Sequence, residues 1–341
     1  QARKSKRGIE MSSAASSSSC QGSSPVERRR VDTFVRHLFP RAASLSATAG
    51  AIVTHSLTRR SRRLQHTHTV LPPKALIGMV HIAPLPGTPF HQSGDRLQEI
   101  VDQAVREAQL LQEAGFDAIM LENMHDAPYL LKKVGPEITA CMTRVMVAVR
   151  QAVDCPLGIQ ILAGANKEAL AVAMATGANF IRVEGFVFSH VADEGIFAEA
   201  DAAKLLRYRK KIGAEDICIF ADIKKKHSSH AITCDLTVGD VAHAAHFFGA
   251  EGVIVTGIST GAEAKPEDVE MTRKAIPNDM LVLVGSGCTP ENLPNLFDNA
   301  DAFIVGSYIK EQGEWDHPLS LSRCKDIVRA RNRLLLASGH H

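Results

Sequence analysis

The chain of 341 residues carries 39 Lys and Arg against 37 Asp and Glu, a net charge of +2, and 45 % of its residues are hydrophobic. This composition is typical of a globular protein with one large domain or two smaller ones. No apolar run reaches the roughly 18 residues that a membrane span needs, so we expect no membrane-spanning helix.

The charge is unevenly distributed along the chain. Residues 1–70 contain thirteen Lys and Arg and three acids, a net charge of +10, which leaves residues 71–341 at −8. An acidic folded region excludes nucleic acid as its partner, because duplex binding needs clustered positive charge on the fold itself. The first 70 residues are rich in Ser, Ala and Arg and lack a periodic apolar face. This composition predicts an unstructured organellar transit peptide, mitochondrial or, as the alternative, plastid; the other interpretation is a disordered basic tail.

The seven Cys are scattered and form no C-x-x-C pair or zinc-finger spacing. This pattern indicates reduced thiols and not a disulfide framework. We therefore expect neither a structural disulfide nor a cysteine nucleophile.

From residue 71 onward, short β-branched runs alternate with amphipathic stretches, which is typical of a parallel α/β fold. Strands are predicted over residues 75–82, 117–122, 157–162, 180–184, 217–223, 252–256, 281–285 and 302–305. Helices are predicted over residues 95–114, 136–152, 167–176, 200–212, 238–248, 266–275, 290–297 and 318–336. Within the first helix, apolar residues recur at three- and four-residue steps, and Gly115 stands where the helix should end.

Eight strand–helix units over residues 71–336 match the roughly 250 residues of a closed (βα)8 TIM barrel, followed by a short unstructured tail at 337–341. The alternative is a doubly wound open sheet. Such sheets usually carry a glycine-rich dinucleotide turn after the first strand, whereas here the first strand leads into a run from His81 to Gly87 that contains three prolines or glycines and no such turn. We therefore predict the barrel.

Active sites of such barrels lie at the carboxyl ends of the strands. The strongest candidates are Asp222 and Lys224, which point the same way because alternate residues of a strand share a face. A carboxylate and an amine at a barrel mouth can transfer protons, and a desolvated lysine also suits Schiff-base chemistry. Glu122 ends the second strand as a further acid, followed by Asn123 as a substrate contact, and His81 ends the first strand. Lys225 and Lys226 are interpreted as solvated.

Two further possibilities concern charged neighbours at the strand ends. Glu184 either pairs with Arg182 structurally or acts as a catalytic acid. No residue spacing marks a metal site, and we assign no cofactor; a divalent metal held by His81, Glu122 and Asp222 is an alternative that no motif supports.

Glycine and serine follow three neighbouring strands near the end of the chain. Strand seven leads into Gly285, Ser286 and Gly287, strand eight leads into Gly306 and Ser307, and Gly257 follows strand six. Glycine lets the backbone approach an anion, and helix N-termini offer free N–H groups. Because barrels commonly bind phosphate at these loops, we predict a phosphate site there.

The motifs at these strand ends resemble the BtpA/SgcQ family of the ribulose-phosphate-binding barrel superfamily. The matching stretches are residues 77–87, 122–128, 180–183, 193–196, 221–227, 284–287 and 304–310. The resemblance implies the same barrel and carries the superfamily's phosphate site onto Gly285, Ser286, Gly287, Gly306 and Ser307. The sequence departs from the family pattern at Glu184, near His125, and at the end of strand three, where residues 163–166 read Ala-Gly-Ala-Asn.

Two functions follow from these observations. One is an enzyme acting on a small phosphorylated metabolite, such as a sugar phosphate or a nucleotide fragment, as a lyase, isomerase or nucleosidase-type hydrolase. Asp222, Lys224 and Glu122 would then share the acid–base work, and His81 would orient the substrate. The alternative is a non-catalytic organellar assembly factor, because the resemblance links one branch of the family to photosystem I biogenesis. The sequence is compatible with a homo-oligomer in either case.

Overall fold

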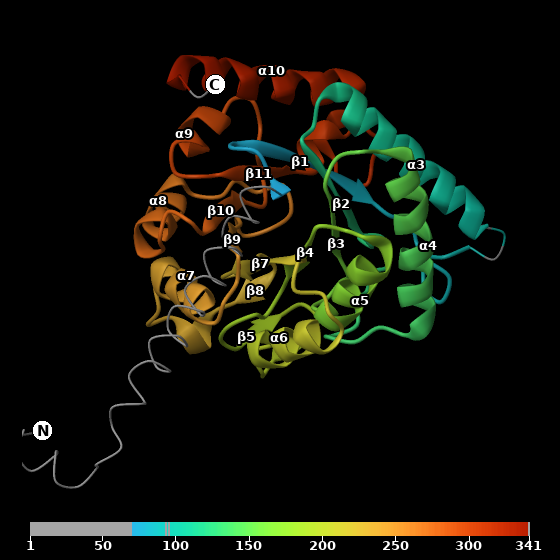
Figure 1. Ribbon diagram of the computed structural model, residues 1–341, viewed down its shortest axis with the longest axis horizontal. Coiled ribbons are helices and arrows are strands. Elements are labelled where there is room, and N and C mark those ends of the chain that lie inside the picture. Colours follow the sequence, from blue (N-terminus) through green and yellow to red (C-terminus); the bar gives the residue numbers. More distant parts are fainter. Residues whose placement is uncertain (1–69, 93, 95, 340–341) are drawn as a thin grey trace, which may run out of the picture. The chain divides into compact units, whose positions relative to one another are not determined.

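The computed structural model describes residues 70–92, 94 and 96–339, and within them the chain forms a closed barrel of parallel strands (Figure 1). The barrel order is β1-β2-β3-β4-β7-β9-β10-β11, returning to β1. The strands are β1 (Ala75–His81), β2 (Ala118–Glu122), β3 (Leu157–Gln160), β4 (Phe180–Val183), β7 (Cys218–Ile223), β9 (Gly252–Val255), β10 (Leu281–Val284) and β11 (Ala302–Val305). The predicted (βα)8 barrel is confirmed, while the predicted transit peptide falls almost wholly outside the described residues.

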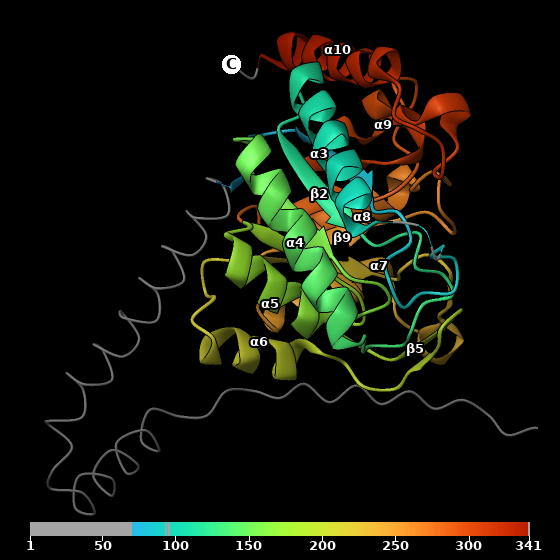
Figure 2. The same ribbon diagram turned by 90° about the vertical axis from the view of Figure 1, so that its right-hand side faces the viewer.

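Helices form an outer ring around the strands, and three of them lie side by side in Figure 2 as α3, α4 and α5. The ring consists of α3 (Leu97–Ala114), α4 (Pro136–Ala152), α5 (Asn166–Thr176), α6 (Ala202–Lys211), α7 (Val238–Phe247), α8 (Pro266–Ala275), α9 (Leu293–Phe297) and α10 (Leu321–Ser338). As predicted, α3 ends at Gly115, whose φ of 96° is accessible to glycine without strain.

The strands are largely apolar, with polar residues near their carboxyl ends, because both of their faces are buried. In β1, Ala75, Ile77 and Met79 belong to the cluster inside the barrel. Leu76 and Val80 point the other way and belong to the cluster between the strands and the helices. Burying one such aliphatic side chain contributes about 1.5–3 kcal/mol, so this two-sided core stabilises the barrel.

Aromatic side chains fill the interior one layer below the carboxyl ends of the strands. The rings of Phe180 and Phe220 lie with their centroids 5.2 Å apart. Gly158 makes room for them, since a Cβ atom there would lie 2.0 Å from the Phe180 ring. The barrel is therefore a packed core, and only its carboxyl-terminal end is left for a site.

Several helix boundaries differ from the prediction by one to three residues, and two of them are instructive. α9 begins at Leu293 and not at residue 290, because the Asn292 side chain binds the preceding loop instead: it accepts from the Thr289 amide and donates to the Gly287 carbonyl. At the other end of the chain, α10 continues to Ser338, two residues beyond its predicted end.

A small antiparallel sheet beside the barrel was not predicted. It consists of β5 (His190–Ala192), β6 (Gly195–Phe197) and β8 (Ser228–Ser229), in the order β6-β5-β8. Runs of two or three residues are too short to show a strand period, so the sequence pattern could not reveal them.

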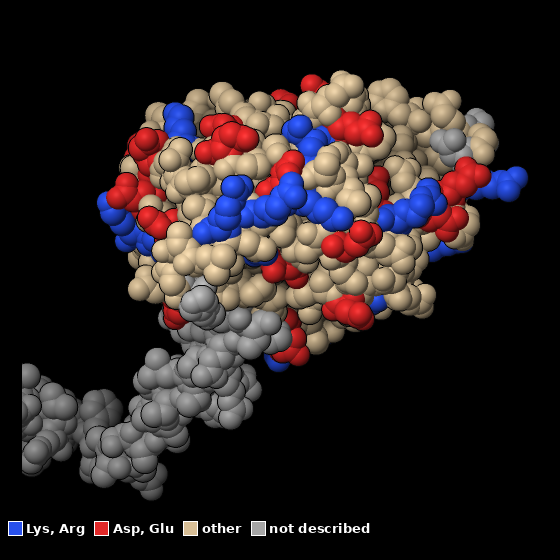
Figure 3. All heavy atoms as spheres, turned by 90° about the horizontal axis from the view of Figure 1, so that it is seen from above, with Lys and Arg blue, Asp and Glu red and all other residues tan. Residues whose placement is uncertain are grey.

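Charges on the face that carries α10 are mixed in sign. Figure 3 shows a band of basic side chains there with acidic side chains on both sides of it. Lys325 pairs with Glu113, and Arg329 pairs with Asp326. No helix within the described part of the chain is long and apolar enough to cross a membrane.

Candidate active site

The carboxyl ends of the strands surround a hollow of about 350 Å³, which we call the mouth hollow. Since the barrel strands are parallel, side chains from distant parts of the sequence meet there. The residues that line it are Met79, His81, Glu122, Met124, Arg182, Lys226, Thr260, Gly261, Gly285, Ser286, Gly287, Ile304, Gly306 and Ser307.

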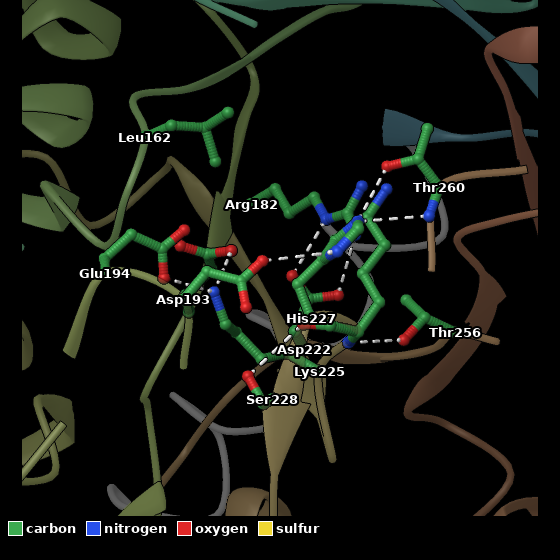
Figure 4. A network of polar contacts seen from close by, with 12 residues as sticks. Leu162, Arg182, Asp193, Glu194, Asp222, Lys225, His227, Ser228, Thr256 and Thr260 are labelled. Carbon is green, nitrogen blue, oxygen red and sulfur yellow. Dashed lines mark hydrogen bonds and ion pairs between the residues drawn. The ribbon is translucent and has the colours of Figure 1, made fainter. Parts of the chain in front are cut away.

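Asp222 is held by Arg182 in a two-point ion pair (Figure 4). Nε of Arg182 donates to Oδ2 at 2.9 Å and Nη2 donates to Oδ1 at 3.0 Å, with both side chains buried. Arg182 therefore pairs with Asp222 and not with Glu184. Because both oxygens of Asp222 accept from the guanidinium, the arrangement suits Asp222 to positioning Arg182 at the edge of the mouth hollow.

His81 is neutral, and its hydrogen bond fixes which ring nitrogen carries the proton. Nδ1 lies 2.9 Å from the carbonyl oxygen of Trp315, which can only accept, so Nδ1 is protonated and Nε2 presents a lone pair. Nε2 lies 4.0 Å from the Glu122 carboxylate. Burial lowers the pKa of His81 to about 3, with the charge of Lys310 acting in the same direction. His81 is therefore suited to accept a hydrogen bond from a ligand.

Glu122 is a buried acid with the properties of a proton donor. Burial raises its pKa, while the positive charges of Arg182 and Lys226 oppose the shift. Its side chain is 6 % exposed and lines the mouth hollow. A carboxyl group in this environment can hold a proton at a higher pH than a solvated one and give it to a bound ligand.

Lys224 lies outside the mouth hollow. β7 ends at Ile223, and Lys224 has a φ of 44°, so the strand alternation assumed for Asp222 and Lys224 stops before Lys224. Its ammonium donates to the carbonyl of Leu236. Lys224 and Asp222 instead border a second hollow, together with His190 and His230.

Lys226 is the lysine that lines the mouth hollow. Its backbone amide donates to the hydroxyl of Thr256 at 3.1 Å, but within the described residues its ammonium makes no hydrogen bond or ion pair. Burial lowers the pKa of Lys226, and the charge of Arg182 lowers it further. The sequence pattern missed this residue because the turn at Lys224 redirects the chain after the strand.

Lys225 forms a buried ion-pair group with two acids. Its Nζ lies 3.1 Å from Glu184 and 3.4 Å from Glu194, and 5.1 Å from the centre of the Phe197 ring. Glu184 follows β4, and Glu194 lies in the turn between β5 and β6 (Figure 4). Lys225 therefore joins the small sheet to the barrel mouth, which explains why the sequence could not distinguish it from a solvated lysine.

Asn123 connects three loops and does not line the mouth hollow. Its Oδ1 accepts from the Leu162 amide at 2.7 Å, and its Nδ2 donates to Asp126 at 2.8 Å. Asp126 in turn accepts from the Leu85 amide at 2.8 Å. With both ends of its amide occupied, Asn123 holds these loops together.

Two of the predicted phosphate-binding glycines lie where loops cross closely. A Cβ atom on Gly257 would be 2.4 Å from the Ala262 carbonyl oxygen, and one on Gly287 would be 2.5 Å from Cα of Glu263. Ser286 joins these loops, because its hydroxyl accepts from the Gly257 amide at 2.6 Å and donates to the Ala262 carbonyl at 2.8 Å. These residues shape one wall of the mouth hollow.

Free backbone N–H groups are available at two of the predicted phosphate positions. Within the described residues, the amides of Gly287 and Ser307 donate to no acceptor, and both residues line the mouth hollow. Gly306 is not tightly constrained, since a Cβ atom there would make ordinary van der Waals contact with Met79 at 3.5 Å and with His81 at 3.6 Å. Gly285 is more constrained, with Ile254 2.3 Å from its Cβ position. An anion can be bound by such free amides.

Two buried oxygens near the mouth have no hydrogen-bond partner within the described residues, namely Oε1 of Gln160 and Oε2 of Glu184. Leaving a buried polar atom unpaired is unfavourable, so these oxygens are suited to a ligand or water that donates to them. No group of three or more His, Cys, Asp or Glu side chains in this part of the chain could hold a metal ion. His81, Glu122 and Asp222 thus do not form the metal cluster considered from the sequence.

The barrel and its charged mouth define a TIM-barrel protein with a polar site at the carboxyl ends of its strands. The BtpA family model matches residues 72–333, and the chain belongs to the BtpA family.

Relatives cover nearly the whole barrel. An uncharacterized Caenorhabditis elegans protein named as mitochondrial is 42 % identical over 76 % of this chain and 93 % of its own length. An uncharacterized Pyrococcus furiosus protein is 38 % identical over 77 % of this chain and 96 % of its own. The photosystem I biogenesis protein BtpA of Synechocystis is 32 % identical over 75 % of this chain and 87 % of its own. Among solved structures, thiamine phosphate pyrophosphorylase from Pyrococcus furiosus aligns over 77 % of this chain and 96 % of its own, with a TM-score of 0.46 at 12 % identity.

Proposed function

We infer that this chain is an enzyme that binds a small phosphorylated metabolite in the mouth hollow and acts on it by acid–base or lysine-assisted chemistry. The observation that carries the proposal is the composition of one hollow: a buried acid (Glu122), an unpaired amine (Lys226) and the free amides of Gly287 and Ser307 all line it. The amides would bind the phosphate, and the acid and amine would act on the rest of the molecule. His81 would orient it through Nε2.

Thermal denaturation with and without phosphorylated probes tests the binding step. Orthophosphate and ribose 5-phosphate should raise the melting temperature and unphosphorylated ribose should not, since a ligand at 100 times its Kd stabilises the folded state by about 2.7 kcal/mol. Ser307→Asp places a carboxylate beside the free amide and should abolish the response. Ser307→Asn introduces a side chain of the same shape as aspartate without its charge, and it should keep the response. The chain's one Trp, Trp315, contacts His81, so its fluorescence gives a second readout. No response to either probe, or an undiminished response in Ser307→Asp, would contradict the proposal.

The second candidate is an organellar assembly factor for a membrane complex, which the name of the Synechocystis relative favours. Removing the protein should then lower the abundance of such a complex. Complementation with Ser307→Asp separates the two functions: rescue indicates that assembly does not need the mouth hollow, and failure indicates that it depends on binding there.

We also propose that residues 1–70 direct the chain to the mitochondrion, with the plastid as the alternative. Their net charge of +10 and the mitochondrial name of the Caenorhabditis elegans relative support this. Residues 1–70 fused to a fluorescent protein should carry it into mitochondria. A fusion that stays in the cytosol would contradict the proposal, and one that enters plastids would favour the alternative.

A further inference from the structure

Lys226 differs from the neighbouring lysines in having no polar partner for its ammonium. Lys224 donates to the Leu236 carbonyl, and Lys225 is paired with Glu184 and Glu194. Lys226 extends from the same turn but lines the mouth hollow, where no described side chain accepts from its Nζ. Structural lysines are paired when buried, so an unpaired amine facing a hollow is available for chemistry.

The surroundings of Lys226 favour the uncharged amine. The guanidinium of Arg182 lines the same hollow, and Arg182 is locked in place by Asp222. Burial and this positive charge lower the pKa of Lys226, although Glu122 and Asp222 oppose the shift. An amine becomes a nucleophile only when it has lost its proton, and placement in a desolvated site beside another cation is one way in which proteins achieve this.

We propose that Lys226 forms an imine with the carbonyl group of a phosphorylated aldehyde or ketone bound in the mouth hollow. This rests on the proposed function, because the free amides of Gly287 and Ser307 would hold the phosphate. Among the reaction types considered above, imine formation at Lys226 favours a lyase or an isomerase that uses a Schiff base.

The acid that imine formation requires is present in the same hollow. The nitrogen of Lys226 attacks the carbonyl carbon, the π electrons move to oxygen, and a proton passes from nitrogen to oxygen to give a carbinolamine. Glu122 then protonates the hydroxyl group, and water leaves with the electrons of the C–O bond as the nitrogen lone pair forms the iminium bond. Glu122 is left as a carboxylate, whose charge stabilises the iminium cation.

Reductive trapping tests the proposal on the full chain. The protein is incubated with dihydroxyacetone phosphate or D-glyceraldehyde 3-phosphate and sodium cyanoborohydride, whose hydride converts the iminium to a stable secondary amine. Mass spectrometry of the intact chain should show one adduct per molecule, and peptide mapping should place it on Lys226. Orthophosphate should compete with labelling, and unphosphorylated dihydroxyacetone should label more slowly.

Variants of neighbouring residues make the outcome decisive. Lys226→Met should lose the adduct yet still respond to orthophosphate in the thermal assay, which shows that it folds and binds. Lys224→Met should keep the adduct, and Glu122→Gln should form it more slowly. The inference is overturned if the label lies on Lys224, if it spreads over exposed lysines, or if Lys226→Met is labelled like the wild type. Absence of any adduct while orthophosphate still stabilises the protein overturns the imine alone, whereas absence of the phosphate response overturns the proposed function.

Discussion

Arg182 and Asp222 form a two-point ion pair between the neighbouring strands β4 and β7, inside the barrel and directly above the layer of Phe180 and Phe220. This pair separates the packed part of the barrel from the mouth hollow. Its geometry changes the role expected for Asp222, since a carboxylate whose two oxygens accept from one guanidinium positions that group and is not available as a free base.

Breaking this pair should therefore destabilise the protein strongly. Asp222→Ala leaves the Arg182 guanidinium buried without its partner, and we expect a loss of about 3–5 kcal/mol in the free energy of unfolding. The double variant Arg182→Met/Asp222→Leu removes both charges and should recover most of that loss. Urea denaturation of Arg182→Met, Asp222→Leu and the double variant measures the coupling between the two side chains. A change below about 1 kcal/mol in Asp222→Ala would show that the pair behaves like an exposed one.

The sequence predicted the barrel because its signals are local. Each of the eight strands is a short, largely apolar run, α3 has an apolar stripe, and Gly115 ends α3 where a positive φ is needed. The late start of α9 depends on Asn292 binding two backbone groups, which no hydrophobic period records. The strands β5 and β6 are likewise too short to show a period.

The mouth was predicted less completely because its contacts depend on register and on one turn. Which acid meets Arg182 is decided by the pairing of β4 with β7, where Arg182 lies opposite Phe220 and Asp222 lies two residues further along. Which lysine faces the hollow is decided by the left-handed φ of Lys224. The sequence therefore predicted Lys224 at the mouth and Lys226 in solvent, whereas Lys226 lines the mouth hollow and Lys224 does not.

The protonation state of His81 can be measured directly. The pKa of His81 is lowered to about 3, so its ring should remain neutral, with the proton on Nδ1, throughout the range in which a solvated histidine titrates. Long-range proton–nitrogen NMR spectra should show this tautomer from neutral pH down to about pH 4. A ring that titrates near 6.5, or one protonated on Nε2, would contradict the structure.

The same shift makes a prediction for acid stability. Because the folded pKa is below the unfolded value of about 6.5, the unfolded chain binds the extra proton more readily. The contribution of His81 to the free energy of unfolding is thus fully present above pH 6.5 and is lost as the pH falls toward about 3. The upper value of this contribution is about 5 kcal/mol. Over this range His81→Asn should lose less stability than the wild type in urea denaturation. The control for the loss of a histidine is His243→Asn, because His243 is exposed. If the free energy of unfolding falls equally with pH in all three proteins, the prediction is contradicted.

Glu122 should show the opposite dependence on pH. Its folded pKa is raised by burial, so its contribution to stability is fully present below the unfolded pKa and is lost as the pH rises through the folded pKa. Glu122→Gln removes the ionisable group and should be more stable than the wild type at neutral pH, with the difference disappearing in acid. The exposed Glu311→Gln serves as the matched control.

The substitution Glu122→Gln should also slow imine formation. Glutamine has no proton to give, and loss of a general acid typically slows a step by about 10²–10⁴-fold, so reductive trapping should be slower in Glu122→Gln. A variant that is both destabilised at neutral pH and trapped at the wild-type rate would show that Glu122 is a structural acid.

The ion-pair group of Lys225 should behave as a local clamp. Lys225→Met leaves the buried Glu184 without its partner and frees Glu194 in the β5–β6 turn, which we expect to cost about 3–5 kcal/mol. The matched control is Lys210→Met, whose pair with Glu215 is exposed and is worth at most about 1 kcal/mol. Adding Glu184→Gln to Lys225→Met should restore part of the loss, because it removes the uncompensated charge.

Hydrogen exchange distinguishes a local from a global effect of this change. Since Lys225 joins the small sheet to the barrel, its loss should speed amide exchange across β5 and β6 more than across β4 and β7, whose ladder it does not join. Uniformly faster exchange would indicate that Lys225 supports the whole barrel. Unchanged exchange in β5 and β6 would show that the sheet is held by packing of Phe197 alone, and the clamp would then have no part in shaping the mouth.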